Sequence, residues 1–398
     1  MDALTTPSNW QKVRLGDMTT SFTKQTGFDY SASIKPTLIK EQLPHYIPFI
    51  QNKDFSGHYI NYKTDYFIPN EIAIRFPQIL LNEKCLLISI VGSIGNVAVF
   101  NHSQDAFTGC AIAVLKFKEK KSLDFVMHFL MSASGQKSLL NIVKASSHKS
   151  IILADLRDLL IPLPPLNEQI AIANILSDLD HYLYSLDALI LKKESVKKAL
   201  SFELLSQRKR LKGFNQAWQR VRLGDIFFIT AGGDLSKPHY SNTKQSDFNY
   251  PIYSNAIEKK GLYGYSSFFI IKNKSITITS RGTIGVAFFR DYPYVPIGRL
   301  LVLQPKISNI DCRFYTEYIN SKVKFNTEQT TIPQLTIPKV ALCEIPLPPL
   351  NEQIAIANIL STLDHEIISL KNKKRQFENI KKALNHDLMS AKIRVLNK

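Results

Sequence analysis

The sequence predicts an α+β fold with an internal pseudo-two-fold repeat: two mixed α/β domains separated by two long helices, which pair antiparallel in a coiled coil. Three observations support this prediction. One seventeen-residue phrase occurs twice, a shorter motif also occurs twice, and two long stretches contain neither proline nor glycine. These features divide the chain into a first domain, a first long helix, a second domain and a second long helix, at residues 1–165, 166–212, 213–349 and 350–398.

The longer repeat is identical in both copies. Residues 161–177 read IPLPPLNEQIAIANILS, and the same letters return at residues 345–361, an offset of 184 residues. Chance does not produce such a match, so the chain is an internal duplication. A period of this length exceeds that of a solenoid unit and suits a whole domain followed by a helix.

The shorter repeat marks where each copy begins. Residues 10–17 read WQKVRLGD and residues 218–225 read WQRVRLGD, an offset of 208 residues. Between the two repeats the sequences diverge, and only a weak match of Gly92-Ser-Ile-Gly95 with Gly282-Thr-Ile-Gly285 remains. Repeated motifs that flank divergent sequences predict two modules that recognise two different ligands or binding sites.

The divergent parts are predicted to mix strands with short helices. Runs rich in β-branched and apolar residues predict strands, and these runs lie at residues 85–100, 111–117, 275–279, 284–289 and 300–303. Short helices are expected at residues 123–134 and 311–321. The glycines inside the strand-like runs indicate tight turns or a close approach of backbone.

Polar and basic residues surround these glycines. Free N–H groups, hydroxyls and arginines in a loop suit contacts with phosphates and base edges. A hairpin turn with a structural arginine is the alternative for any one of them. The DNA-binding candidates are Ser93, Asn96, Lys144, His148, Lys149, Ser280, Arg281, Thr283, Arg299, Gln334 and Lys339.

Each shared phrase leads into a predicted long helix. Two prolines precede Asn167, which suits an N-cap, and the apolar residues that follow recur mostly at spacings of three and four. The first helix is expected to run to about Gln207 with Gly213 as its terminator, and the second from Asn351 to about Lys392. Roughly 40 residues make a helix about 60 Å long, which needs a partner. That partner is the other copy or, alternatively, the helix's own domain.

The composition favours an anionic ligand. The chain of 398 residues carries 50 Lys+Arg against 33 Asp+Glu, a net charge of +17. Such an excess suits a phosphate backbone or an anionic membrane, although some globular proteins are merely basic. No apolar run reaches the roughly 20 residues of a spanning helix, and the first residues lack a secretory pattern. Cys85, Cys110, Cys312 and Cys343 form no zinc pattern, so we expect a cytoplasmic protein with reduced thiols.

No catalytic constellation is apparent in the sequence. A phosphate-binding loop, a Rossmann fingerprint, an Asn-Pro-Pro-aromatic motif, an acidic nuclease cluster and a Ser/His/Asp set are all missing. His181 and His365 recur beside aspartates, but everything around them recurs as well. We therefore expect a binding protein with no catalytic residue, metal ligand or cofactor of its own.

Taken together, these motifs resemble those of the specificity subunit of type I restriction-modification enzymes. The resemblance rests on both copies of IPLPPLNEQ, the WQxVRLGD openings, the Lys-Lys-Ala-Leu motifs at 197–200 and 381–384, and SRGTIG at 280–285. It covers essentially the whole chain. The first copy departs from the pattern, because Val91 stands where the second copy has Arg281.

The resemblance implies a function and a set of partners. Two target recognition domains, similar to that of the TaqI-type adenine methyltransferase, each read half of a split, asymmetric sequence in double-stranded DNA. The long helices fix the half-site spacing and dock two methylation subunits, which carry S-adenosylmethionine and methylate adenine N6. Restriction subunits supply the ATP- and Mg-dependent chemistry. The docking candidates are the repeated polar residues at the helix starts, Asn167, Glu168, Gln169, Asn351, Glu352 and Gln353.

Two other classes of function remain open from the sequence. The first is a self-sufficient nuclease or methyltransferase of unfamiliar type. The second is a scaffold that joins helical partners and whose domains bind protein. Turnover by the purified chain would favour the first, and failure to bind random duplex DNA at low salt would favour the second.

Overall fold

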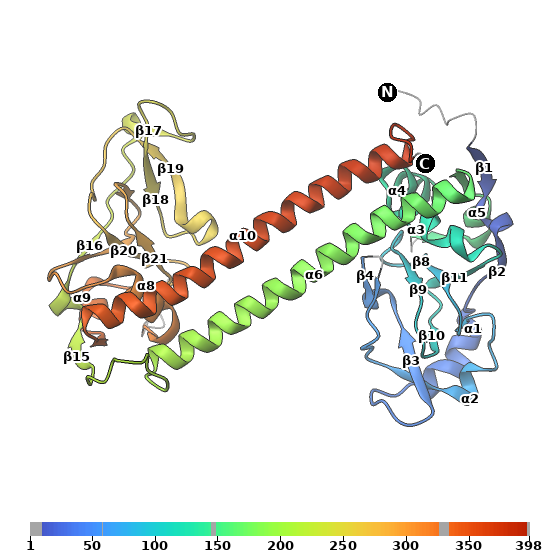
Figure 1. The fold of residues 1–398 in the computed structure, drawn as a ribbon, viewed down its shortest axis with the longest axis horizontal. Coiled ribbons are helices and arrows are strands. Elements are labelled where there is room, and N and C mark those ends of the chain that lie inside the picture. The colour runs from blue at the N-terminus through green and yellow to red at the C-terminus, as the bar shows by residue number, and fades with distance from the viewer. Residues whose placement is uncertain (1–9, 58, 145–148, 326–333, 396–398) are drawn as a thin grey trace. The chain divides into compact units, whose positions relative to one another are not determined.

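The computed structural model describes residues 10–57, 59–144, 149–325 and 334–395. Its contacts divide the chain into two compact units. Unit 1 comprises Met1–Ser185 and Lys374–Lys398, and unit 2 comprises Leu186–Lys373. Each unit therefore holds one α/β domain together with part of both long helices (Figure 1).

Unit 1 is built on an antiparallel sheet of four strands. Their order is β2 (Thr19–Lys24), β11 (Ile112–Phe117), β8 (Cys85–Ser89) and β9 (Val97–Phe100). Strand β8 is buried along its whole length, and α3 (Leu123–Met131) packs against β8 and β9. The strands predicted at 85–100 and 111–117 are confirmed. The helix predicted at 123–134 breaks at Ser132, whose hydroxyl caps α4 (Ala133–Asn141) by accepting from the Gly135 N–H at 3.1 Å.

A second sheet in unit 1 was not predicted. Its strands pair in the order β6 (Phe67–Pro69), β3 (Tyr46–Ile50), β10 (Ala106–Thr108) and β7 (Leu80–Leu81), with β3 and β10 parallel. Its residues share a core with the outer face of the first sheet. Other short strands and helices of unit 1 include β4 (Phe55–Ser56), β5 (Tyr59–Ile60), β12 (Val143–Lys144), β13 (Ser150–Ile151), α1 (Gly27–Asp29), α2 (Asn70–Ala73) and α5 (Leu153–Arg157).

Unit 2 repeats this architecture with different loops. Its antiparallel sheet has the order β16 (Phe227–Ala231), β23 (Leu301–Pro305), β20 (Ser275–Ile278) and β21 (Ala287–Arg290). Its second sheet has the order β17 (Tyr240–Ser241), β19 (Leu262–Ser266), β18 (Tyr250–Tyr253) and β22 (Val295–Pro296), with β18 and β22 parallel. The helices of the domain are α7 (Leu223–Ile226), α8 (Cys312–Lys322) and α9 (Ile337–Ala341). The predicted strands and the helix near 311–321 are confirmed.

The two repeated motifs pair with each other in each unit. In unit 1, β1 (Gln11–Arg14) runs antiparallel to β14 (Leu160–Leu163), with Val13 opposite Ile161. In unit 2, β15 (Gln219–Arg222) runs antiparallel to β24 (Glu344–Leu347), with Val221 opposite Ile345. The motifs that open and close each domain thus form one ribbon. This pairing gives a structural reason for both motifs being repeated.

Each long helix contains 40 residues. Helix α6 spans Leu166–Leu205 and α10 spans Leu350–Met389. The predicted N-cap at Asn167 is wrong, because the Gln169 N–H already bonds to the Pro165 carbonyl at 3.0 Å. The helices also end before the predicted positions. Gln207 (φ 58°) and Ala391 (φ 53°) turn the backbone out of the helix, whereas Gly213 lies well beyond the end of α6.

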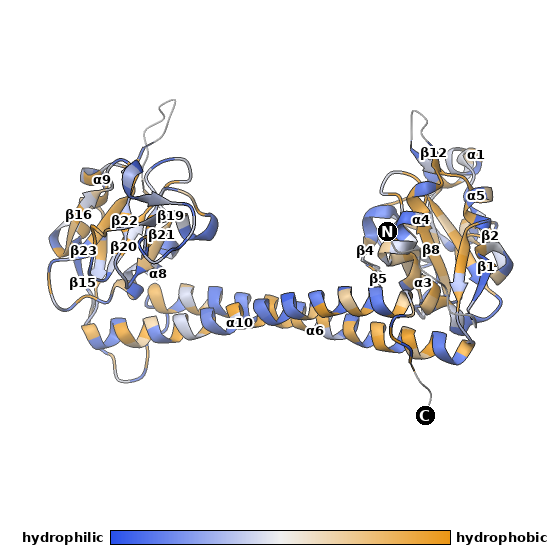
Figure 2. Ribbon diagram, turned by 90° about the horizontal axis from the view of Figure 1, so that it is seen from above, coloured by the Kyte–Doolittle hydropathy of each residue, from blue (hydrophilic) through white to orange (hydrophobic). Residues whose placement is uncertain are grey.

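The helices pair antiparallel within each unit and also enter the domain cores. In unit 1 the start of α6 and the end of α10 both contribute to the core, through Ile172 and Leu388. In unit 2 the end of α6 and the start of α10 do the same, through Leu204 and Ile356. Both predicted partners, the other helix and the helix's own domain, are therefore used. Figure 2 shows hydrophobic and hydrophilic residues alternating along both helices, as expected for helices with one buried face.

Candidate nucleic-acid interface

Equivalent hairpins connect β8 to β9 and β20 to β21. In each, a glycine N–H closes the turn at the end of the first strand: Gly95 donates to the carbonyl of Ser89, the last residue of β8, at 3.0 Å, and Gly285 donates to the carbonyl of Thr279, directly after β20, at 2.8 Å. The glycines of the Gly-x-x-Gly motifs have φ between 71° and 88°, a region that side chains disfavour. The predicted tight turns are confirmed. The turns expose Ser93 and Asn96 in unit 1 and Arg281 and Thr283 in unit 2.

An asparagine that the sequence analysis missed supports each hairpin. Asn255 follows β18, and its side-chain oxygen accepts from the Ser280 N–H at 2.7 Å while its amide donates to the Gly298 carbonyl at 2.6 Å. Asn52 follows β3, and its amide donates to the Val91 carbonyl at 2.6 Å. In both sequences a proline stands four residues before the asparagine. That spacing is the only sequence signal, and it is weak.

The structure brings four of the unit 2 candidates together. The buried hydroxyl of Ser280 donates to the Arg299 carbonyl at 2.6 Å, so the hairpin touches the segment that leads into β23. Arg281 forms a β-bridge with Gln334, and its guanidinium donates to the Gln334 side chain at 3.5 Å. Arg281, Arg299 and Gln334 are exposed, whereas Ser280 is buried and positions its neighbours. Lys339 lies apart from them, half-buried on α9.

Strand register identifies the corresponding positions in unit 1. Because Ile88 pairs with Val97 as Ile278 pairs with Ala287, Val91 corresponds to Arg281. The bridge from Val91 to Ser150 makes Ser150 the counterpart of Gln334, and the β10 register makes Ala111 the counterpart of Arg299. The departure noted at Val91 therefore extends over the whole cluster, which keeps its backbone framework and loses both arginines.

Unit 1 has basic residues on a neighbouring edge instead. Lys144 lies on β12 opposite Ser150, and exposed Lys149 precedes Ser150 directly. Lys144 forms an ion pair with Asp155 at 3.0 Å. His148, predicted with them, lies outside the described residues. Beside the hairpin, a cavity of about 350 Å³ is lined by residues that include Tyr30, Asn52 and Cys110.

The glutamates and glutamines predicted to dock partner subunits are occupied inside the chain. Glu352 is 1% exposed and accepts two hydrogen bonds from Arg210 at 3.0 and 3.1 Å and one from the Trp218 indole at 2.9 Å. Glu168 is 7% exposed and accepts two from Arg394 at 2.7 and 2.9 Å. The start of each long helix is thus tied to the chain that follows the other helix.

The neighbouring glutamines are buried as well. The Gln353 amide donates to the Pro348 and Asn309 carbonyls at 2.8 and 3.0 Å, and the Gln169 amide donates to the Pro164 carbonyl at 2.7 Å. The docking prediction needs correction for Glu168, Gln169, Glu352 and Gln353, because buried and bonded side chains cannot be offered to a partner. Asn167 and Asn351 are exposed and stay predicted docking residues.

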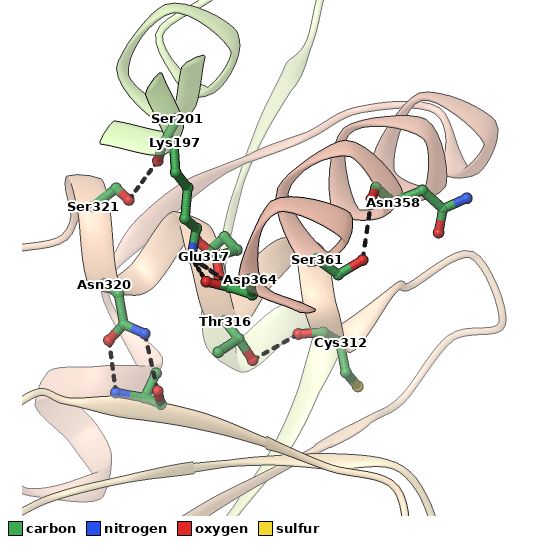
Figure 3. Close-up of polar contacts among 11 residues, drawn as sticks. Lys197, Ser201, Cys312, Thr316, Glu317, Asn320, Ser321, Asn358, Ser361 and Asp364 are labelled. Atoms are coloured by element: carbon green, nitrogen blue, oxygen red, sulfur yellow. Dashed lines mark hydrogen bonds and ion pairs between the residues drawn. The ribbon is translucent and has the colours of Figure 1, made fainter. Parts of the chain in front are cut away.

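A second pair of equivalent contacts links the helices further along. Lys197 on α6 bonds to Asp364 on α10 at 2.7 Å and to Glu317 on α8 at 3.2 Å (Figure 3). In unit 1 the corresponding pair is Lys381 and Asp180. Both pairs follow from residues repeated at the offset of 184, so the sequence contained the signal, but only as part of a general repeat.

Burial shifts the pKa values of these groups. Burial raises the pKa of the Glu317 carboxyl, and Lys197 offsets only part of this. Burial also raises the pKa of Asp180 against the opposing effect of Lys381. For Lys197, burial alone would lower the pKa, but its bond to Asp364 and the charges of Glu317 and Asp364 raise it overall. These groups hold the helices and the domain of each unit together.

Comparison with known proteins decides the family. The family model described as the type I restriction modification DNA specificity domain matches residues 7–193 and again residues 215–379. The chain belongs to the type I restriction-modification DNA specificity family. The type I restriction enzyme MjaVIII specificity subunit of Methanocaldococcus jannaschii is 26% identical over 439 aligned residues, which cover 100% of this chain and 96% of that protein.

Solved specificity subunits share the fold. The S subunit of a type I restriction-modification system from M. genitalium superimposes with a TM-score of 0.68 at 19% identity, covering 97% of this chain and 98% of that one. A chain from a structure on complex assembly and conformational transition of the type I system superimposes with a TM-score of 0.51 at 15% identity, covering 96% and 98%. Identities this low establish the fold alone.

The described residues of this specificity chain offer no metal centre. Among them, no three histidines, cysteines, aspartates or glutamates lie close enough to hold an ion. The four cysteines are free, and burial raises the pKa of the Cys85 and Cys312 thiols to about 12, which favours their protonated form. No helix in the described ranges is long and apolar enough to cross a membrane.

Proposed function

We propose that this chain reads a bipartite, asymmetric sequence in double-stranded DNA, one half-site with each unit, and directs adenine-N6 methylation and restriction by partner subunits. One observation carries the proposal. The two units keep the same hairpin framework, yet the equivalent positions around it hold exposed Arg281, Arg299 and Gln334 in unit 2 and half-buried Val91, Ala111 and Ser150, respectively, in unit 1. Readers that differ at these positions should select different half-sites.

The chain itself is proposed to be non-catalytic. Two methylation subunits would bring S-adenosylmethionine, and restriction subunits would bring the ATP- and Mg-dependent activities, all in the cytoplasm. Docking of the methylation subunits is assigned to the exposed face of the repeated phrase. That face includes Asn167 and Asn174 on α6 and Asn351, Ile354 and Asn358 on α10. Helices α6 and α10, which connect the units, would set the spacing between the half-sites.

Binding-site selection from a random duplex library tests the proposal. The full-length chain should enrich two short, different sequences separated by a fixed non-specific spacer. A palindromic target would contradict the asymmetry, and enrichment of no sequence would contradict DNA reading itself. Turnover by the purified chain with DNA, S-adenosylmethionine, magnesium and ATP would contradict the non-catalytic assignment.

The salt dependence of binding provides a second test. Lysine and arginine contacts with phosphates release counterions, so affinity should fall steeply as salt increases. With a net charge of +17 the chain has ample cations for several such contacts. An affinity that does not change with salt would argue against the phosphate backbone as a ligand.

A further inference from the structure

Arg299 has a backbone conformation that arginine rarely adopts. Its φ is 67°, in the left-handed region that favours glycine. The surrounding chain holds it there from both sides. The Arg299 N–H donates to the Gly232 carbonyl at 3.0 Å, and its own carbonyl accepts from the Ser280 hydroxyl at 2.6 Å. A strained residue that several bonds over-determine marks a place where the position of the side chain matters.

The neighbouring residues are fixed in the same way. Gly298 donates to the Gly233 carbonyl at 2.8 Å, and its own carbonyl accepts from the Asn255 amide at 2.6 Å. Asn255 also binds the Ser280 N–H at 2.7 Å, so one side chain joins the hairpin to the Arg299 segment. These hydrogen bonds therefore fix the backbone from which the Arg299 side chain extends.

The Arg299 side chain is free to bind a ligand. The residue is exposed, and within the described part of the chain its guanidinium has no hydrogen-bond or ion-pair partner. The Arg299 carbonyl accepts from Ser280, which directly precedes exposed Arg281, and Arg281 bridges to exposed Gln334. Among the described residues, no carboxylate pairs with Arg281 or Gln334. Such a cluster presents donors to an acceptor-rich surface.

A comparison of the two units favours a base, rather than a phosphate, as the ligand of the Arg299 side chain. A guanidinium binds the O6 and N7 acceptors of guanine in the major groove with two parallel hydrogen bonds, the commonest specific contact between a side chain and a base. Phosphates are alike in both half-sites, so a residue that serves them is expected in both units. Unit 1 has Ala111 at this position, and no positive φ occurs there.

We propose that Arg299 reads a guanine in the half-site bound by unit 2, with Asn255 and Ser280 as positioning residues. This inference rests on the proposed function of the chain as a DNA reader. It adds a definite base and a definite residue. The half-site bound by unit 1, which lacks both arginines, is read without this contact.

The test is binding-site selection from a random duplex library with three variants of the full-length chain. Arg299→Gly removes the side chain and leaves a residue that adopts φ 67° without strain, so folding is retained. Arg299→Lys keeps the charge but not the fork of donors. Arg220→Ala is the matched control, because Arg220 is an exposed arginine of the same unit that pairs with Glu344 on the frame.

The expected result is selective. Wild-type protein and Arg220→Ala should enrich the same bipartite target, with an invariant guanine in one half-site. Arg299→Gly should lose the preference at that guanine only and bind the wild-type target roughly 5- to 100-fold more weakly. Arg299→Lys should not restore the preference. The other half-site should be unchanged in every variant.

Two results would contradict the role of Arg299, and a third would contradict the proposed DNA-reading function on which that role rests. If Arg299→Gly keeps every base preference, Arg299 does not read a base. If it weakens all sequences equally, Arg299 contacts a phosphate. If the wild-type chain enriches no sequence at all, the DNA-reading function fails, whereas the first two results leave that function standing.

Discussion

The repeated motifs that begin and end each domain form its frame. The two frames contain the same buried polar residues, but the hydrogen bonds of these residues differ between the units. In unit 2 Glu352 accepts from both Arg210 and the Trp218 indole, and the Gln353 oxygen accepts from the Asp311 N–H at 2.9 Å. In unit 1 the buried Trp10 indole nitrogen and Gln169 oxygen have no hydrogen-bond partner among the described residues. A repeated sequence therefore guarantees equivalent positions, while the divergent domain around them decides how well each polar group is satisfied.

The asparagine that supports the hairpin is also more completely hydrogen-bonded in unit 2 than in unit 1. In unit 2 both ends of the Asn255 amide are bonded, whereas in unit 1 the Asn52 oxygen is buried without a partner among the described residues. Unsatisfied buried acceptors cost stability. Unit 2 should thus have the more rigid frame and reading surface.

Exchange of a whole reading part should have the largest effect. Arg14 pairs with Leu160 as Arg222 pairs with Glu344, so residues 223–343 can replace residues 15–159 at matching strand ends. Binding-site selection on this chimera should return the unit 2 half-site twice. The reverse exchange should return the unit 1 half-site twice. A target with both original half-sites would show that the units do not read independently.

Replacing the glutamate at the start of each long helix should destabilise the two units by different amounts. Glu352→Ala leaves Arg210 and Trp218 without their acceptor and should destabilise unit 2 by about 2–4 kcal/mol. Glu168→Ala should cost unit 1 less, because among the described residues Glu168 has one partner, Arg394, whose side chain is 38% exposed.

The two tryptophans allow each unit to be followed separately during urea unfolding. Trp10 lies in unit 1 and Trp218 in unit 2, so a Trp10→Phe background reports on unit 2 and a Trp218→Phe background on unit 1. Exposed Asn351→Ala is the control and should change little. Equal losses for the two glutamates would remove the contrast between the frames.

Alanine in place of the closing glycines should have a smaller effect on each unit. Both positions have positive φ, and an added Cβ would lie 2.9 Å from the Phe325 ring at Gly285 and 3.0 Å from the Gln136 side chain at Gly95. We expect losses of about 1–2 kcal/mol in unfolding free energy, larger for Gly285. Gly27→Ala, which meets nothing within 4 Å, is the control. No loss at either glycine would contradict the strained-turn assignment.

The smallest effect is expected from a change of pH at Glu317. Because burial raises the pKa of the folded Glu317 carboxyl above its ordinary value, the folded state holds the proton more tightly than the unfolded state. Wild-type stability should therefore decrease as pH rises through the folded pKa. Glu317→Gln, which resembles the protonated form, should unfold at a higher temperature than wild type at pH 7 and at the same temperature below about pH 4. A lower unfolding temperature at pH 7 would mean that the bond to Lys197 outweighs burial.

The Glu317→Gln substitution should not change the pH dependence of unit 1, which has no glutamate at the equivalent position. The aromatic contacts of Trp10 with Phe125 and of Trp218 with Phe314 align α3 with α8, which makes His128 the counterpart of Glu317. His128 contacts the Ser177 hydroxyl at 3.0 Å. The Trp10 signal should consequently be the same in Glu317→Gln and in wild type across the pH range.

The candidate site could be predicted only in part. The Gly-x-x-Gly motifs predicted the hairpin turns. The basic character of Arg281 and Arg299 made them candidates for DNA contacts. Asn52 and Asn255 could not be found, because an asparagine after a strand is common and its bonds join segments far apart in the chain. The repeated glutamates and glutamines were misassigned to docking, since a sequence repeat does not distinguish a residue facing a partner from one facing its own chain.

The amino-acid sequence alone was enough to predict the duplication, the order of domains and helices, and three of the four strands in the first sheet of each unit; β2 and β16 were not predicted. Those features are written in local periodicity and in identity between copies, which need no knowledge of distant contacts. The three-dimensional fold was needed to show that the two repeated motifs pair with each other, that Glu168 and Glu352 are buried, and that Ser280 and Asn255 fix the segment containing Arg299. These features depend on contacts between residues many positions apart, and neither composition nor spacing specifies such contacts.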